Sequence, residues 1–165
     1  MVRIAGMVVT LIFLVGSAMA DDKHVQKYGI WTISCTGPRD IAPCALSATV
    51  MSDAGDDITI RITANESGKA SIDCLVPHSV GLEAGVGLTT EPNRVRVFPY
   101  RTCNSEGCIA TFAIDDQLSE ALEAGTDVLI QYATLDRKAI DVPIASHGFN
   151  EAFAQFRVRN SRPSP

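Results

Sequence analysis

Alternation of apolar and polar residues, with a period of two, recurs along most of the chain. The clearest case is the segment 58–63, Ile-Thr-Ile-Arg-Ile-Thr, in which every second residue is apolar. This period is typical of a β-strand with one face buried and the other in water. Other short segments rich in β-branched or aromatic residues predict further strands. They lie at 28–35, 44–50, 70–76, 94–98, 109–114, 126–135 and 139–145, with a bend and a short strand within 81–88.

Two segments have the spacing of helices instead. The first, 117–124, follows a capping aspartate (Asp115 or Asp116) and ends before Gly125. The second begins at Phe149 and carries an apolar stripe of three phenylalanines and an alanine. Many short strands, frequent turns and two small helices predict an all-β fold, an antiparallel β-sandwich or barrel-like domain with two short helices.

The segment 100–114 is expected to organise this domain. Cys103 and Cys108 bracket a short polar loop, and Gly107 within it suits a tight turn. Apolar side chains of a strand follow directly at 109–114. We therefore predict a disulfide-closed loop that leads into a core strand.

The first 20 residues predict a signal peptide. Arg3 gives a basic start, residues 7–15 are almost entirely apolar, and Ala18-Met19-Ala20 fits a cleavage site. A membrane anchor is the alternative, but the apolar run is shorter than the roughly 20 residues of a spanning helix. Cleavage would start the mature chain at Asp21. We expect export to the periplasm, to the outer-membrane surface or out of the cell.

Composition limits the domain count and the partners. The chain of 165 residues has 19 acidic and 14 basic residues, so its net charge is −5 at pH 7. An acidic protein is a poor partner for nucleic acid or anionic lipid. No segment after residue 20 is apolar enough to span a membrane. The length suits one domain, predicted over 21–156, with a disordered basic tail over 157–165.

All five cysteines lie after the predicted cleavage site, in a compartment where disulfides persist. Several arrangements of two bridges are possible, and we favour pairing between near neighbours, Cys35 with Cys44 and Cys103 with Cys108. Cys74 is then left over. It lies in step with the apolar residues of its strand, which predicts a buried, unreactive thiol. Pairing of Cys74 between molecules is the alternative.

The search for catalytic and metal-binding patterns gives none. His24, His78 and His147 are far apart in sequence, and no Cys-x-x-Cys or Gly-x-Ser-x-Gly occurs. Eight residues between Cys35 and Cys44 are too many for a two-pair zinc site, and an oxidising compartment favours disulfides over zinc. We therefore predict no catalytic residue, no metal and no cofactor. An exported enzyme that uses one of these histidines as a base is the alternative.

Three arginines are candidates for contact with an anionic partner. Arg94 and Arg96 lie on one face of a predicted strand, and Arg101 follows nearby. A strand face that only water contacts is the alternative interpretation.

Several separated stretches together resemble the invasion-associated locus B family of alphaproteobacterial envelope proteins. They are Tyr-Gly-Ile-Trp-Thr-Ile-Ser-Cys at 28–35 with Cys44, a Gly-Leu-x-x-Gly-Val-x-Leu run within 77–88, Pro-Tyr-Arg-Thr-Cys-Asn-Ser-Glu-Gly-Cys at 99–108, and Gly-Phe-Asn-Glu-Ala-Phe at 148–153. The resemblance covers 28–153. It differs at Ile30, where the family often has an acidic residue, and at Cys74, an additional cysteine. The resemblance implies an exported, non-enzymatic, all-β protein of a family named for bacterial entry into host cells.

These observations favour a binding or envelope-associated module, linked to host-cell interaction or invasion. It would contact an unknown protein or glycan, at the cell envelope or host surface, through sheet edges and the Cys103–Cys108 loop. The alternatives are an exported enzyme of unknown class and a structural envelope component that self-associates through Cys74 or an edge strand.

Overall fold

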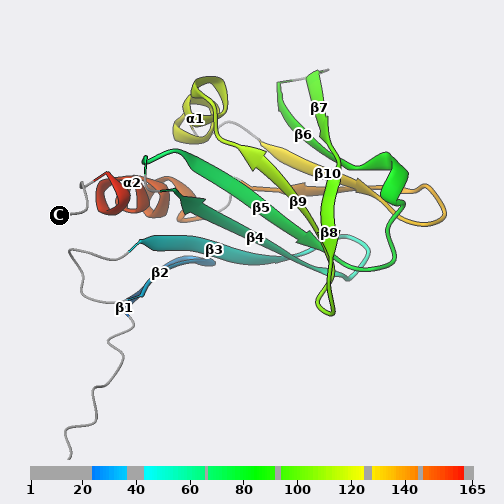
Figure 1. Ribbon diagram of the computed structural model, residues 1–165, viewed down its shortest axis with the longest axis horizontal. Coiled ribbons are helices and arrows are strands. Elements are labelled where there is room, and N and C mark those ends of the chain that lie inside the picture. The colour runs from blue at the N-terminus through cyan, green and yellow to red at the C-terminus, as the bar shows by residue number, and fades with distance from the viewer. Residues whose placement is uncertain are drawn as a thin grey trace, which may run out of the picture.

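The computed structural model describes residues 24–36, 43–65, 67–91, 94–124, 128–144 and 147–161. The predicted signal peptide, 1–20, lies outside these residues. The described strands form two antiparallel sheets, one ordered β1-β2-β3-β4-β5-β9-β8 and the other β11-β10-β6-β7 (Figure 1). Their bounds are β1 His24–Tyr28, β2 Trp31–Cys35, β3 Cys44–Met51, β4 Asp57–Ala64, β5 Ala70–Val76, β6 Val86–Glu91, β7 Arg94–Phe98, β8 Tyr100–Cys103, β9 Cys108–Ala113, β10 Leu129–Ala133 and β11 Ala139–Pro143. A short 3₁₀ helix, η1, spans Leu82–Ala84.

Two α-helices complete the described chain: α1, Asp116–Glu123, and α2, Phe149–Asn160. Neither sheet closes on itself, so the predicted sandwich is confirmed and the barrel-like alternative is wrong. Helix α1 begins as predicted, because the Asp115 side chain accepts a hydrogen bond from the backbone N–H of Leu118. Strand β11 lies at a sheet edge, as Pro143 predicted.

Apolar alternation forms the inner face of the seven-stranded sheet. In β4, Ile58, Ile60 and Ile62 are fully buried, whereas Arg61 between them is exposed on the opposite face. The register places Ile60 opposite Cys74 of β5. Cys74 is a free thiol, and burial raises its pKa to about 12. Its reactive thiolate form is therefore suppressed near neutral pH.

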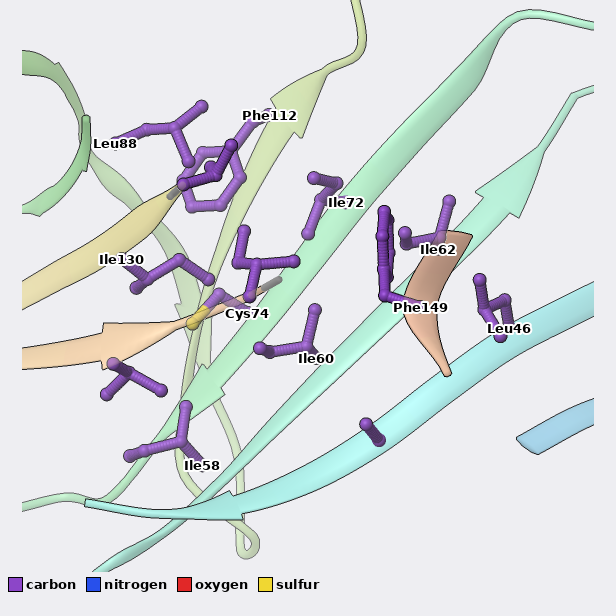
Figure 2. Close-up of a cluster of buried hydrophobic side chains, with 14 of the residues drawn as sticks. Leu46, Ile58, Ile60, Ile62, Ile72, Cys74, Leu88, Phe112, Ile130 and Phe149 are labelled. Atoms are coloured by element: carbon purple, nitrogen blue, oxygen red, sulfur yellow. The ribbon is translucent and has the colours of Figure 1, made fainter. Parts of the chain in front are cut away.

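Two different elements cover this inner face. The four-stranded sheet packs on one part and helix α2 on the other, against β1, β2 and β3. Figure 2 shows side chains from both sheets and from α2 within one hydrophobic cluster. An aromatic pair marks each contact. Phe98 of β7 lies 4.8 Å from Phe112 of β9, and Phe149 of α2 lies 4.9 Å from Trp31 of β2, measured between ring centroids.

The start of α2 is held by a close backbone contact with the β1–β2 turn. Gly29 (φ 60°) and Gly148 (φ 87°) both have left-handed conformations. A Cβ on Gly148 would lie 2.3 Å from the carbonyl oxygen of Tyr28, and one on Gly29 would lie 2.3 Å from that of His147. Only glycine fits both sites, so this contact fixes where Phe149 enters the core.

The N-terminal hairpin differs from the prediction. The segment 28–35 is not one strand, because Gly29 and Ile30 form a turn between β1 and β2. The residues before Tyr28, where we predicted no strand, form β1 from His24 onward. Its polar composition hid the strand, since β1 is an edge whose residues gain little from burial.

The C-terminal end of α2 also differs from the prediction. The helix continues to Asn160, although we expected a disordered tail from 157. The Asn160 side chain accepts a hydrogen bond from the Cys44 backbone N–H (3.0 Å) and donates one to the Cys44 carbonyl (3.2 Å). Arg159 donates to the side-chain oxygen of Gln26. These contacts bind the last turn to β1 and β3. Residues 162–165 lie outside the described part.

We expect Gly148→Ala to lower the free energy of unfolding by about 2–4 kcal/mol, because it combines a left-handed alanine with a clash against Tyr28. Gly68→Ala is the matched control, since Gly68 has φ 78° and open space around it. It should cost only about 1 kcal/mol. Urea denaturation measures both values. Equal losses in the two variants would show that the close contact contributes nothing.

Asn160→Ala should lower the free energy of unfolding by about 1–2 kcal/mol, because two hydrogen bonds to the Cys44 backbone are removed. Asn150→Ala, an exposed change on the same helix, is the control and should leave stability almost unchanged. Thermal unfolding monitored by circular dichroism compares the two. If both variants melt like the wild type, the Asn160 contact does not hold the helix.

Candidate binding surface

The edges of the two sheets meet along one side of the sandwich. Strand β7 is the last strand of the small sheet, β8 is the last strand of the large sheet, and only Pro99 separates them in the chain. Proline cannot donate a ladder hydrogen bond, so the chain leaves one sheet there and enters the other. This side, which we call the β7–β8 edge, carries all three arginines that the sequence analysis singled out.

A disulfide hairpin continues the β7–β8 edge. Cys103 of β8 and Cys108 of β9 are direct cross-strand partners and form a disulfide. The Asn104 side chain accepts hydrogen bonds from the backbone N–H groups of Glu106 and Gly107, which fixes the loop internally. A ring nitrogen of His78 is hydrogen-bonded to the Asn104 carbonyl. The tip is therefore exposed but preorganised, which lowers the entropic cost of binding.

The second disulfide lies elsewhere. Cys35 and Cys44 are also direct cross-strand partners, in β2 and β3, and their disulfide is buried. It lies beside the last turn of α2, where Asn160 bonds to Cys44. Both bridges are those that the sequence analysis favoured. Cys35–Cys44 supports the fold, whereas Cys103–Cys108 shapes a surface.

Arg96 is partly engaged within the molecule. Its guanidinium forms an ion pair with Asp115, and it lies over the ring of Phe98, 5.9 Å from the ring centroid. The hydrogen bond from Arg96, together with that from the Leu118 N–H, lowers the pKa of Asp115 below its usual value. Arg96 therefore links β7 to the start of α1, a structural role that the sequence analysis did not foresee.

The other two arginines have different settings. Arg94 begins β7, and its side chain lies outside the described part of the chain. Arg101 is exposed on β8, in the other sheet. The structure thus brings the three positions to one side of the sandwich, along two successive edge strands.

Sequence reasoning missed an apolar strip on the other face of β7. Val95 and Val97 are 49% and 63% exposed, and Leu82 of η1 is 55% exposed. The valines lie over two glycines of the neighbouring segment: a Cβ on Gly87 would be 2.9 Å from Val95, and one on Gly85 3.1 Å from Val97. The Arg-Val-Arg-Val alternation was the available signal, but alternation alone does not show which face is buried.

A separate groove of about 460 Å³ lies between α1, α2 and the β4–β5 turn. Its floor includes Phe153 and Phe156, and its rim includes Lys69, Asp116 and Arg157. Arg157 forms an ion pair with Glu123. Among the described residues, no histidine or cysteine lines the groove.

The histidines considered for catalysis have other neighbours. His78 contacts the disulfide hairpin, and His147 lies against Gly29 at the start of α2. The side chain of His24 lies outside the described part. Among the described residues, no three His, Cys, Asp or Glu side chains come together as a metal site. In that same part of the chain, no helix has the length and apolar character needed to cross a membrane.

Comparisons with known proteins agree on one family. The model of the family described as "Invasion associated locus B (IalB) protein" matches residues 31–157. An invasion protein B homolog of Brucella abortus (strain 2308) is 25% identical over 136 residues, covering 81% of this chain and 79% of that protein. A homolog from Brucella abortus biovar 1 (strain 9-941) gives the same values.

A solved structure shares the fold. The crystal structure of invasion associated protein B from Bartonella henselae matches with a TM-score of 0.64 and 21% identity, over 82% of this chain and 96% of that chain. The family model spans strands β2 to β11, both disulfides and most of α2. This protein belongs to the invasion associated locus B family.

Proposed function

We propose that this protein is an exported envelope protein that acts by binding rather than by catalysis. Its relatives carry the name invasion protein B, which supports a role in contact between bacterium and host cell. Two disulfides suit an oxidising compartment such as the periplasm or the cell exterior. The preorganised, exposed hairpin at the end of the β7–β8 edge is the observation that carries the proposal.

The contact surface is the Cys103–Cys108 hairpin together with Arg101. Its partner is a protein or glycan, of the envelope or of the host surface, with anionic groups that pair with the arginine. The protein as a whole is acidic, so an exposed cation such as Arg101 can attract anionic groups that the net charge of the protein repels. On this edge, Arg96 pairs with Asp115, whereas Arg101 is exposed and forms no ion pair with the described residues.

Arg101→Glu should weaken binding of the purified protein to host cells by about tenfold, because it replaces an attractive rim charge by a repulsive one. Lys27→Glu is the matched control: Lys27 is an exposed cation on β1, the opposite edge of the same sheet. Flow cytometry of labelled protein on cultured cells gives the half-saturating concentrations. Equal behaviour of the two variants would contradict the assignment of this surface. If neither the variants nor the wild type bind to host cells, the proposed function is wrong.

The mature protein should begin at Asp21, because cleavage after Ala20 fits the pattern of the first 20 residues. Mass spectrometry of the protein from periplasmic and surface fractions measures its N-terminus. Ala20→Arg, which disrupts the small-residue site, should leave the precursor uncleaved, whereas the conservative change Ala20→Ser should not. Recovery of uncleaved wild-type protein from the cytosol would contradict export.

A further inference from the structure

We propose that strand β7 accepts an extended strand of a partner protein in which acidic and aliphatic side chains alternate. This inference rests on the proposed binding function and specifies a partner for a neighbouring part of the same edge. The first observation is the position of β7. Among the described strands, β7 pairs with β6 on one side only. Its other side presents backbone groups that an added strand can bond.

The other three sheet edges have features that discourage strand addition. Strand β11 ends at Pro143 and exposes Asp141. Strand β8 has only four residues and leads into the disulfide-closed hairpin. Strand β1 is contacted by α2, whose Arg159 bonds to Gln26. Prolines, charges, short irregular strands and covering elements are the usual protections of sheet edges.

Strand β7 instead exposes apolar side chains at its edge. Val95 and Val97 project from the outer face, and Leu82 of η1 is exposed as well. The valine side chains lie over Gly85 and Gly87, and these glycines have no side chains that could cover the valines. An added strand would place its own outer side chains beside these valines. Aliphatic cross-strand neighbours would bury this exposed surface.

The inner face of β7 carries a positively charged side chain, unlike the apolar outer face. Arg96 presents five N–H donors, and its ion pair with Asp115 uses one of its two terminal nitrogens. Residues of an added strand alternate between the two faces, so a position opposite Arg96 favours Asp or Glu, and positions opposite the valines favour Val, Ile or Leu. This complementarity defines the partner strand.

A second copy of the chain fits this edge less well. If two β7 strands paired about a two-fold axis with their valines on one face, the arginines of both copies would share the other face. Like charges on neighbouring strands are destabilising, whereas the carboxylates of an acidic strand would pair with the arginines. The charge pattern therefore favours a partner protein over self-association.

The test uses three synthetic peptides of equal length and the purified, oxidised protein. The first peptide alternates Glu and Val, the second alternates Lys and Val, and the third is the Glu-Val peptide with alternate backbone amides methylated. Fluorescence anisotropy measures affinity, and amide hydrogen exchange measures protection of β7. We expect saturable binding of the Glu-Val peptide, protection at Val95 to Val97, and at least about tenfold weaker binding of the other two.

Two protein variants locate the site. Val97→Asn should weaken binding of the Glu-Val peptide about fivefold or more by removing apolar contact without changing charge. Val158→Asn is the matched control, because Val158 is 55% exposed on α2 and Val97 is 63% exposed. It should leave the affinity unchanged. Circular dichroism checks that both variants fold.

Several outcomes would overturn the inference. They are no saturable binding of the Glu-Val peptide up to about 1 mM, equal affinity for the methylated peptide, or equal weakening by the two valine variants. A dimer in analytical ultracentrifugation that Val97→Asn dissociates would assign the edge to a second copy. If the peptide fails while Arg101→Glu still weakens binding to cells, strand addition is wrong and the proposed function stands.

Discussion

The fold depends on covering the apolar face of a sheet that is wider than its partner. Seven strands present this face, and the opposing sheet has only four. The remaining area lies over β1, β2 and β3, where the phenylalanines of α2 pack against Trp31 and its neighbours. Burial of such side chains contributes about 1.5–3 kcal/mol each, so loss of the helix would expose a large part of the core. The contact of Gly29 with Gly148 and the bonds of Asn160 to Cys44 hold the two ends of that helix in place.

Local sequence predicted what local interactions determine. The strict alternation around Ile60, the aspartate before α1 and the near-neighbour cysteine pairs each led to the structure observed. The predictions failed in segments whose structure is determined by contacts with residues far away in the chain. Strand β1 and the last turn of α2 are polar, and each is held by contacts with residues more than 100 positions away, as in the pairs Gln26–Arg159 and Cys44–Asn160. No pattern within either segment contains that information.

The candidate site was predictable only in part for the same reason. The sequence indicated an arginine stripe and a disulfide loop, but it did not show that both lie on adjoining edge strands. It also did not show that Arg96 pairs with Asp115, which lies 19 residues away in the chain. The exposed valines were missed because a strand of alternating Arg and Val normally buries its valines. In β7 those valines cover glycines at a sheet edge and remain in contact with water.

The buried thiol of Cys74 places a demand on the order of events during oxidative folding. In the folded chain it lies between Ile60 and Ala110 of the neighbouring strands, so no oxidant can reach it. In the unfolded, reduced chain it would be one thiol among five, able to form wrong disulfides. Enclosure of β5 by β4 and β9 must therefore outpace thiol exchange. The central strands of the large sheet thus shield the cysteine that forms no disulfide from thiol exchange.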